Sequence, residues 1–250
     1  MVVFWRCKKC RAEKSIRRGS WFACSKLNLQ EIFFLTWELI KGTASSNIEE
    51  DFGFSSTTLA DWRQFVNEQV LDYVELMSNK IGGVGKVVEV DESKFGKRKY
   101  NKGHYVEGQW VFGGVERDSG KVVLVAVHER SQETLIALIK QWIEPGTTII
   151  SDCWKGYNHD VLTKERFKHL TVNHSLNFVD PSTGAHTNTN ESTWRHVKIH
   201  FPTYNMQNDA SFHLAMFMFE KSCYEKKIDL CNAFFEIIRD VDWENFTYNL

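Results

Sequence analysis

The sequence predicts a mixed α/β fold, and three stretches of the chain carry that prediction. Residues 87–93 read VVEVDES, an alternation of apolar and acidic side chains that is typical of a strand with one buried face. Residues 147–152 read TTIISD, a second β-branched run that ends in an acid. Residues 187–198 begin with polar side chains and continue as a helical stretch. The acids in these stretches are Asp91, Asp152 and Glu191. Each stretch therefore places a carboxylate near the end or the start of a regular element.

The elements between these acids follow one another in a defined order. Residues 109–127 predict a strand hairpin with its turn at Asp118-Ser119-Gly120. Residues 131–142 have the apolar spacing and the N-terminal serine of a capped helix. Residues 167–173 supply a last strand. Three strands, a helix, a strand and a later helix are the layout of a ribonuclease-H-like domain, which we expect to span residues 86–205.

A carboxylate on a central strand needs a partner, because burying an unpaired charge costs on the order of several kcal/mol. Three carboxylates at one end of a sheet can hold two metal ions about 3.5–4 Å apart for phosphoryl transfer. We therefore expect Asp91, Asp152 and Glu191 to bind two Mg²⁺ or Mn²⁺ ions. His174 and His186 lie near the third acid in the sequence. Since these metals prefer oxygen ligands, we interpret the histidines as groups that support the ligands or contact phosphate.

Basic residues follow each of the acids closely. Residues 94–100 mix lysine and arginine with aromatic side chains, and we expect a loop that contacts a phosphate backbone; a solvated hairpin loop is the alternative. Residues 154–157 place a lysine between aromatic side chains, which suits a nearby DNA end. Arg195 and Lys198 follow Glu191 by four and seven residues, a spacing that places the three side chains on one face of a helix. The alternative is an ordinary exposed helix with an ion pair. The residues expected to contact DNA are Lys94, Lys97, Lys155, Arg195 and Lys198.

Residues 1–27 form a basic arm. Up to position 26 the chain has eight lysines and arginines against one glutamate, although its net charge is −1. This local charge predicts contact with a polyanion, with a solvated terminus as the alternative. Cys7 and Cys10 have the spacing of a zinc knuckle, but zinc needs four ligands. Cys24 could be a third ligand and no residue is an evident fourth, so the pair is either half of a zinc site or the remnant of a knuckle.

The remaining segments are predicted to be helical. Residues 28–80 contain three amphipathic stretches separated by short turns, which fit a DNA-reading helix-turn-helix unit or a simple small bundle. The third stretch has four acids against one arginine, a poor pattern for reading a groove. Residues 206–250 predict two more helices, which we expect to pack on the ribonuclease-H-like domain or to form a dimer surface.

The apolar runs and the cysteines of the sequence indicate where in the cell the protein is located. No apolar run approaches the roughly 20 residues of a membrane span, and no signal peptide is apparent. Six cysteines are scattered, with one close pair, which favours a reducing compartment over a disulfide framework. We therefore expect an intracellular protein without membrane contact, nuclear if the cell is eukaryotic.

Several of these motifs resemble those of a known family. They are VEVDES at 88–93, SDCWKGY at 151–157, and HTN at 186–188, which leads to Glu191 and, seven residues on, Lys198. Together they are similar to motifs of the ISXO-type insertion-sequence transposases, whose eukaryotic relatives are the Merlin transposons. The resemblance covers roughly residues 5–220.

The resemblance implies a ribonuclease-H-like fold in which Asp91, Asp152 and Glu191 form the catalytic triad with magnesium or manganese. It implies transposition on double-stranded DNA, at terminal inverted repeats and at a target site, with Lys198 contacting the DNA end. We expect a homodimer or larger assembly on DNA. A non-transposing nuclease of the same fold and a domesticated DNA-binding protein without catalysis are the alternatives.

Overall fold

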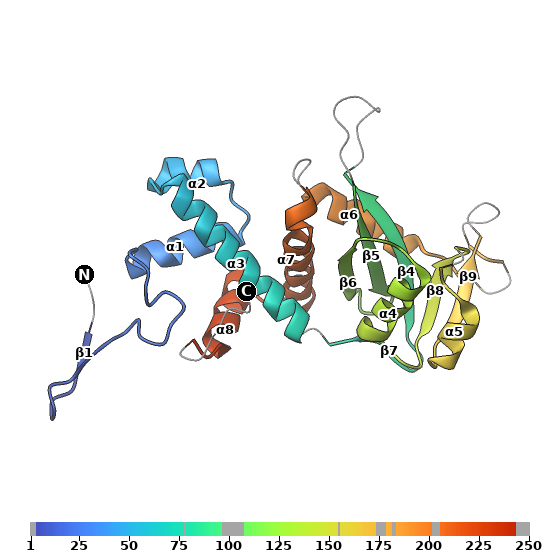
Figure 1. Ribbon diagram of the computed structural model, residues 1–250, viewed down its shortest axis with the longest axis horizontal. Helices are drawn as coiled ribbons and strands as arrows, with labels where there is room; N and C mark the ends of the chain where they lie inside the picture. Colours follow the sequence, from blue (N-terminus) through green and yellow to red (C-terminus); the bar gives the residue numbers. More distant parts are fainter. Residues whose placement is uncertain are drawn as a thin grey trace. The chain divides into compact units, whose positions relative to one another are not determined.

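The computed structural model describes residues 4–77, 79–96, 108–154, 156–173, 179–181, 184–201 and 206–243. The chain divides into two compact units, one of residues 71–225 and one of residues 1–70 with 226–250 (Figure 1). No helix in the described part of the chain combines the length and the apolar character needed to span a membrane.

A five-stranded mixed sheet organises the unit of residues 71–225. Its strands are β4 (Val87–Phe95), β5 (Gln109–Glu116), β6 (Val122–Val127), β8 (Thr148–Asp152) and β9 (Lys168–Val172). They lie in the order β6-β5-β4-β8-β9. The β5 strand is antiparallel to both β4 and β6, whereas β8 is parallel to both β4 and β9. This order, with these directions, is that of a ribonuclease-H-like domain, so the predicted fold is confirmed.

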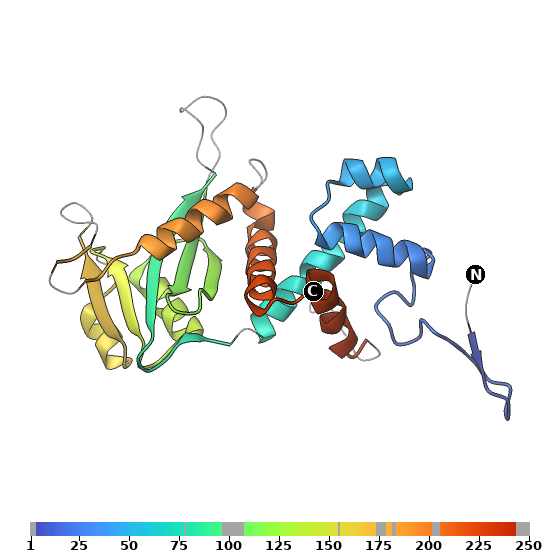
Figure 2. The same ribbon diagram turned by 180° about the vertical axis from the view of Figure 1, so that it is seen from behind.

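Helices cover both faces of this sheet (Figures 1 and 2). Helix α4 (Gln132–Trp142) packs on one face, and α6 (Asn188–His200) with α7 (Met206–Lys226) packs on the other. The α4 side of the core includes Val88, Val90, Phe112, Leu135 and Ile139, and the α6 side includes Phe95, Val111, Trp194, Val197 and Leu214. Because Val88 and Val90 face α4, Glu89 and Asp91 face α6, as the alternation in the sequence predicts.

Three short elements complete this unit, and the sequence did not predict them. Strands β3 (Ile81–Gly82) and β7 (Ile143–Glu144) form a separate parallel pair. Helix α5 (His159–Lys164) is capped by Asn158, whose side chain accepts hydrogen bonds from two backbone amides of its first turn. Elements of two to six residues are too short to show a hydrophobic period, so no periodic pattern could have revealed them.

The other unit is mainly helical. It contains α1 (Leu29–Ile40), α2 (Ser45–Phe52), most of α3 (Ser56–Met77), α8 (Leu230–Asp240), and a hairpin of β1 (Phe4–Arg6) and β2 (Glu13–Ser15). The three helices predicted between residues 28 and 80 are present. Helix α1 begins with a capping box formed by Asn28 and Glu31, and α2 ends at Gly53 in the left-handed conformation. The two C-terminal helices are divided between the units, since α8 packs with α1 whereas α7 belongs with the sheet.

Candidate functional site

Asp91 lies on β4 opposite Gly113 of β5 and faces helix α6. Its Oδ2 accepts a hydrogen bond from Trp194 Nε1 at 3.0 Å, and its Oδ1 accepts one from the backbone N–H of Glu92 at 2.8 Å. Each carboxylate oxygen can accept a further bond, because each has two lone pairs. The half-buried carboxylate is therefore oriented by the protein but not saturated.

Gly113 gives the Trp194 ring room to reach Asp91. A Cβ atom built on Gly113 would lie 2.6 Å from two ring carbons of Trp194, closer than real contacts of this kind. Helix α6 is also tied to the sheet by Asn190, whose Nδ2 donates to the backbone oxygens of Gly113 at 3.1 Å and Glu89 at 3.3 Å. The sequence analysis gave Gly113 no role, because its contacts come from a helix far along the chain.

Asp152 reaches the same part of the sheet from the neighbouring strand. In the parallel pair of β4 and β8, Glu89 lies opposite Ile150, so two residues further along both strands come Asp91 and Asp152. Oδ1 of Asp152 accepts a hydrogen bond from the backbone N–H of Trp154 at 3.0 Å. The two aspartates are therefore neighbours on adjacent strands, Asp152 as the last residue of β8 and Asp91 in the middle of β4, which extends to Phe95 and not to the end that the sequence predicts. Each has an oxygen held by a backbone amide.

The electrostatics link these two aspartates to Glu191, which is exposed in the first turn of α6. Burial raises the pKa of Asp91 to about 6, although the hydrogen bonds from Trp194 and Glu92 lower it. The negative charges of Asp152 and Glu191 contribute to this rise. The charge of Asp91 thus interacts with those of Asp152 and of Glu191, and we call these three acids the acidic edge.

The donors of the acidic edge suit a magnesium or manganese ion, because all are carboxylate oxygens and a cation would offset their mutual repulsion. Within the described residues, no group of three or more His, Cys, Asp or Glu side chains is closely enough gathered to hold a metal ion. The acidic edge is therefore a set of interacting carboxylates rather than a closed ligand shell.

Glu92 is a further acid at this site, and the sequence analysis assigned it no role. It faces the side of β4 opposite to Asp91 and is buried, with 4% of its side chain exposed. The Tyr157 hydroxyl donates a hydrogen bond to Glu92 Oε1, and Arg130 Nη1 lies 4.0 Å from Oε2. Burial, together with the charges of Asp91 and Asp152, raises the pKa of Glu92 to about 7, although the hydrogen bond from Tyr157 and the charge of Arg130 lower it. Its position directly after Asp91 was the one available signal.

The basic residues predicted to contact DNA lie in different places in the structure. Lys94 lies within β4, so the expectation that it belongs to a loop is wrong; its Nζ is 5.6 Å from the centre of the Trp110 ring. Strand pairing with β5 extends through Phe95, which is why the loop begins later than predicted. Arg195 and Lys198 are exposed on α6, and Lys198 Nζ is 5.5 Å from the Phe95 ring centre. Lys97, Lys155 and His174 lie outside the described residues.

Arg130, the ion-pair partner of Glu92, contacts two aromatic rings. The guanidinium carbon of Arg130 is 4.3 Å from the Trp110 ring centre and 4.9 Å from that of Trp154. These cation–π contacts fix the position of the guanidinium that pairs with Glu92.

Cys7 and Cys10 lie in the turn of the β1–β2 hairpin. Hydrogen bonds from the backbone amides of Cys10 and Lys9 lower the pKa of the Cys7 thiol from its usual value. This favours the thiolate form that zinc binds. Cys24 is exposed, and these cysteines belong to no group of three metal-binding side chains in the described ranges. A zinc site at Cys7 and Cys10 therefore stays a prediction.

Known proteins match the chain at several levels. The sequence model described as ISXO2-like transposase domain matches residues 81–219, more than half of the chain. A curated protein of Haemophilus influenzae, described as an uncharacterized transposase-like protein, is 29% identical over 85 residues. That match covers 34% of this chain and 66% of the relative, just under two thirds of its length.

Two solved structures show a weaker likeness. A chain of the simian T-cell lymphotropic virus intasome, in complex with PP2A regulatory subunit B56 gamma, matches with 15% identity and a TM-score of 0.39, over 56% of this chain and 50% of that one. The catalytic core domain of BIV integrase matches with 16% identity and a TM-score of 0.36, over 54% of this chain and 83% of that one. Likenesses at these TM-scores carry no argument about function.

Proposed function

This chain belongs to the ISXO2-like transposase family, and from that premise we propose that it is a metal-dependent DNA transposase. The proposed reaction is cleavage of a phosphodiester bond at a transposon end, followed by transfer of that end to target DNA. The acidic edge is the observation that carries this proposal, because Asp91 and Asp152 are neighbours on two strands of a ribonuclease-H-like sheet and the charges of Asp152 and Glu191 both act on Asp91.

In the proposed mechanism, Asp91 and Asp152 would hold two Mg²⁺ or Mn²⁺ ions and Glu191 would be a further ligand to one of them. Two bound ions would supply charge stabilisation and an activated water or 3′-hydroxyl for in-line displacement. The amide and indole donors to Asp91 orient its carboxylate before any ion arrives. Such preorganisation of a ligand supports metal affinity.

The DNA would be held by basic side chains around the acidic edge. Arg195 and Lys198 are exposed on the helix that also carries Glu191, so they are placed to neutralise phosphates near the proposed site. Lys94 would contribute from β4, and the sequence adds Lys97 and Lys155 to the same set. The proposed partner is double-stranded DNA carrying terminal inverted repeats, bound by two or more copies of the chain.

Replacing Asp152 with alanine tests this proposal. The full chain is incubated with Mn²⁺ and duplexes from the DNA that flanks its coding sequence, and both cleaved and joined products are measured. Asp152→Ala should lower cleavage by about 10²-fold or more, a loss seen when one charge-stabilising group is removed. DNA binding, measured by gel shift without metal, should stay unchanged.

Asp118→Ala is the matched control, because Asp118 is an exposed acid in the β5–β6 turn, with 70% of its side chain exposed. It should cleave like the unchanged chain. Full cleavage by Asp152→Ala would contradict the role of that residue. Cleavage without joined products would favour the nuclease, and binding without cleavage by the unchanged chain would favour the domesticated DNA-binding protein.

A further inference from the structure

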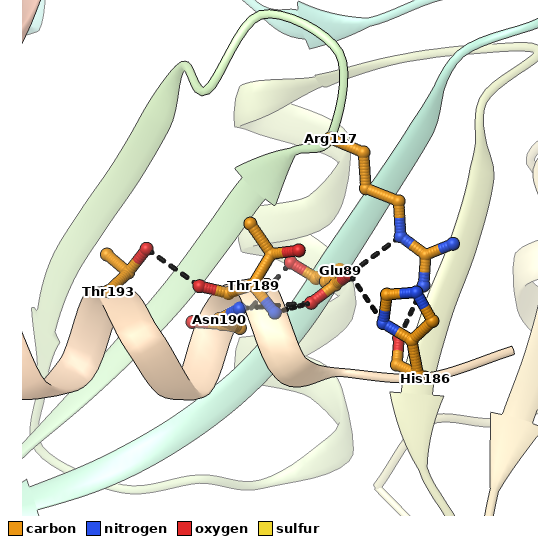
Figure 3. Close-up of polar contacts among 6 residues, drawn as sticks. All are labelled: Glu89, Arg117, His186, Thr189, Asn190 and Thr193. Carbon is orange, nitrogen blue, oxygen red and sulfur yellow. Dashed lines mark hydrogen bonds and ion pairs between the residues drawn. The ribbon is translucent and has the colours of Figure 1, made fainter. Parts of the chain in front are cut away.

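The first turn of α6 is capped by a buried acid from another element (Figure 3). Glu89 of β4 has no exposed surface, and its Oε2 accepts hydrogen bonds from the backbone N–H groups of Thr189 at 2.9 Å and Asn190 at 3.0 Å. The first N–H groups of a helix have no partner within the helix, so they need acceptors from elsewhere. Thr187, at the usual capping position, provides no side-chain hydrogen bond to them. Glu89 thus replaces a local cap.

The same carboxylate is held from its other side. Nε of Arg117 donates to Glu89 Oε1 at 2.6 Å, and its Nη2 donates to the backbone oxygen of His186 at 2.6 Å. Nδ1 of His186 lies 3.4 Å from Glu89 Oε1, within the range of an ion pair when the imidazole is protonated. Figure 3 shows Glu89 between these two side chains and the start of α6. We call Glu89, Arg117 and His186 the helix anchor, because together they tie α6 and the segment before it to β4.

The helix anchor and the acidic edge both involve strand β4 and helix α6. Glu89 and Asp91 are two residues apart on the same face of β4. Glu191 directly follows Asn190, whose amide binds Glu89, and Trp194, one turn further on, binds Asp91. A shift of the first turn of α6 along β4 would therefore move Glu191 relative to Asp91.

We propose that Glu89 is a positioning residue for the metal site. By fixing the first turn of α6 on β4, it sets the separation of the Asp91 and Glu191 carboxylates and so the affinity of the acidic edge for divalent ions. This inference rests on the proposed function, in which Asp91 and Glu191 bind those ions. A purely structural acid would change only stability when it is replaced, whereas a positioning acid also changes metal binding in the folded chain.

The test is Glu89→Gln in the full chain. The amide keeps the size of the side chain but removes the charge that faces Arg117 and the helix N-terminus. Hydrogen exchange at the Thr189 and Asn190 amides should become faster. Binding of Mn²⁺, followed by the electron paramagnetic resonance signal of the free ion, should weaken about tenfold, the lower end of the effect expected when a group behind a metal ligand is removed. The Mn²⁺ concentration for half-maximal cleavage should rise by the same factor.

Glu116→Gln is the matched control. Glu116 is a buried acid on the adjacent strand, 5% exposed, and it also accepts from a backbone amide, that of Gly82 at 2.8 Å. Its ion-pair partner is Lys86, at 3.5 Å. Because these contacts do not involve α6, this variant should lose stability yet bind Mn²⁺ like the unchanged chain.

Arg117→Lys provides a second test if Glu89→Gln does not fold. Lysine keeps the positive charge but cannot bridge Glu89 and the His186 carbonyl as the guanidinium does. This variant should fold and need several-fold more Mn²⁺. A folded Glu89→Gln or Arg117→Lys variant with unchanged Mn²⁺ binding would overturn the inference alone. If Glu191→Gln also binds and cleaves normally, the proposed function fails instead.

Discussion

Two acids on the same face of β4 have opposite surroundings. Glu89 has no exposed surface, and its carboxylate accepts hydrogen bonds from a guanidinium and from two helix amides. Asp91, two residues later, accepts two hydrogen bonds and has no ion pair among the described residues, and burial together with neighbouring negative charges raises its pKa to about 6. The Glu89 carboxylate is therefore satisfied by protein donors, whereas no positive charge is paired with Asp91 in the described residues.

This difference separates two uses of a buried carboxylate. An acid whose lone pairs are filled by protein donors stabilises the fold and has little capacity left for a metal. An acid that is oriented but surrounded by like charges gains most from a divalent cation. Under the proposed function, Glu89 therefore fixes the position of α6, and Asp91 keeps the capacity to bind a metal ion.

Removing the charge of Asp91 should have the largest effect on function. Asp91→Asn deletes a proposed metal ligand but keeps one oxygen that can accept from Trp194, so Mn²⁺-dependent cleavage should fall by about 10²-fold or more. The free energy of unfolding at pH 7 should change by less than about 1 kcal/mol, because relief of a buried charge offsets the lost hydrogen bond. Initial cleavage rates and urea denaturation measure the two quantities.

The comparison predicts the opposite pattern at Glu89, where stability and metal affinity decline together and cleavage recovers at high Mn²⁺. An Asp91→Asn chain that still cleaved, or one that unfolded at much lower urea than Glu89→Gln, would remove the distinction between the helix anchor and the acidic edge.

A smaller effect is expected where the two regions are joined. Gly113→Ala places a methyl group 2.6 Å from the Trp194 ring, so the ring must move away from Asp91. Such overpacking costs about 1–3 kcal/mol of unfolding free energy, and cleavage at limiting Mn²⁺ should fall with it. Gly114→Ala is the control, because a Cβ there lies at ordinary contact distance, 3.5 Å from Ile81. Equal stability of the two variants would mean that Gly113 is not needed for the Trp194 contact.

The sequence could predict the main strands, their order along the chain and the ribonuclease-H-like fold, because these depend on local alternation and on the order of elements. It could not show what Glu89 does, since alternation only places Glu89 and Asp91 on the same face of one strand. Their difference comes from Thr189 and Asn190, which lie 100 and 101 residues away from Glu89. Glu92 was overlooked for the same reason, as Tyr157 is 65 residues distant.

The smallest effect should come from the single donor that connects α6 to Asp91. Trp194 lowers the pKa of Asp91 through its indole N–H, so Trp194→Phe should raise that pKa above about 6. Because a metal binds the ionised carboxylate in competition with protons, the Mn²⁺ needed for half-maximal cleavage should increase about threefold at pH 6.5 and less at pH 8. Trp142→Phe is the matched control, since Trp142 is also in the core and its buried N–H has no hydrogen-bond partner in the described part of the chain. The control should leave the Mn²⁺ requirement unchanged at both pH values. A shift for Trp194→Phe that is the same at pH 6.5 and pH 8 would mean that the indole acts on Glu191 through packing of α6, and not on the charge of Asp91.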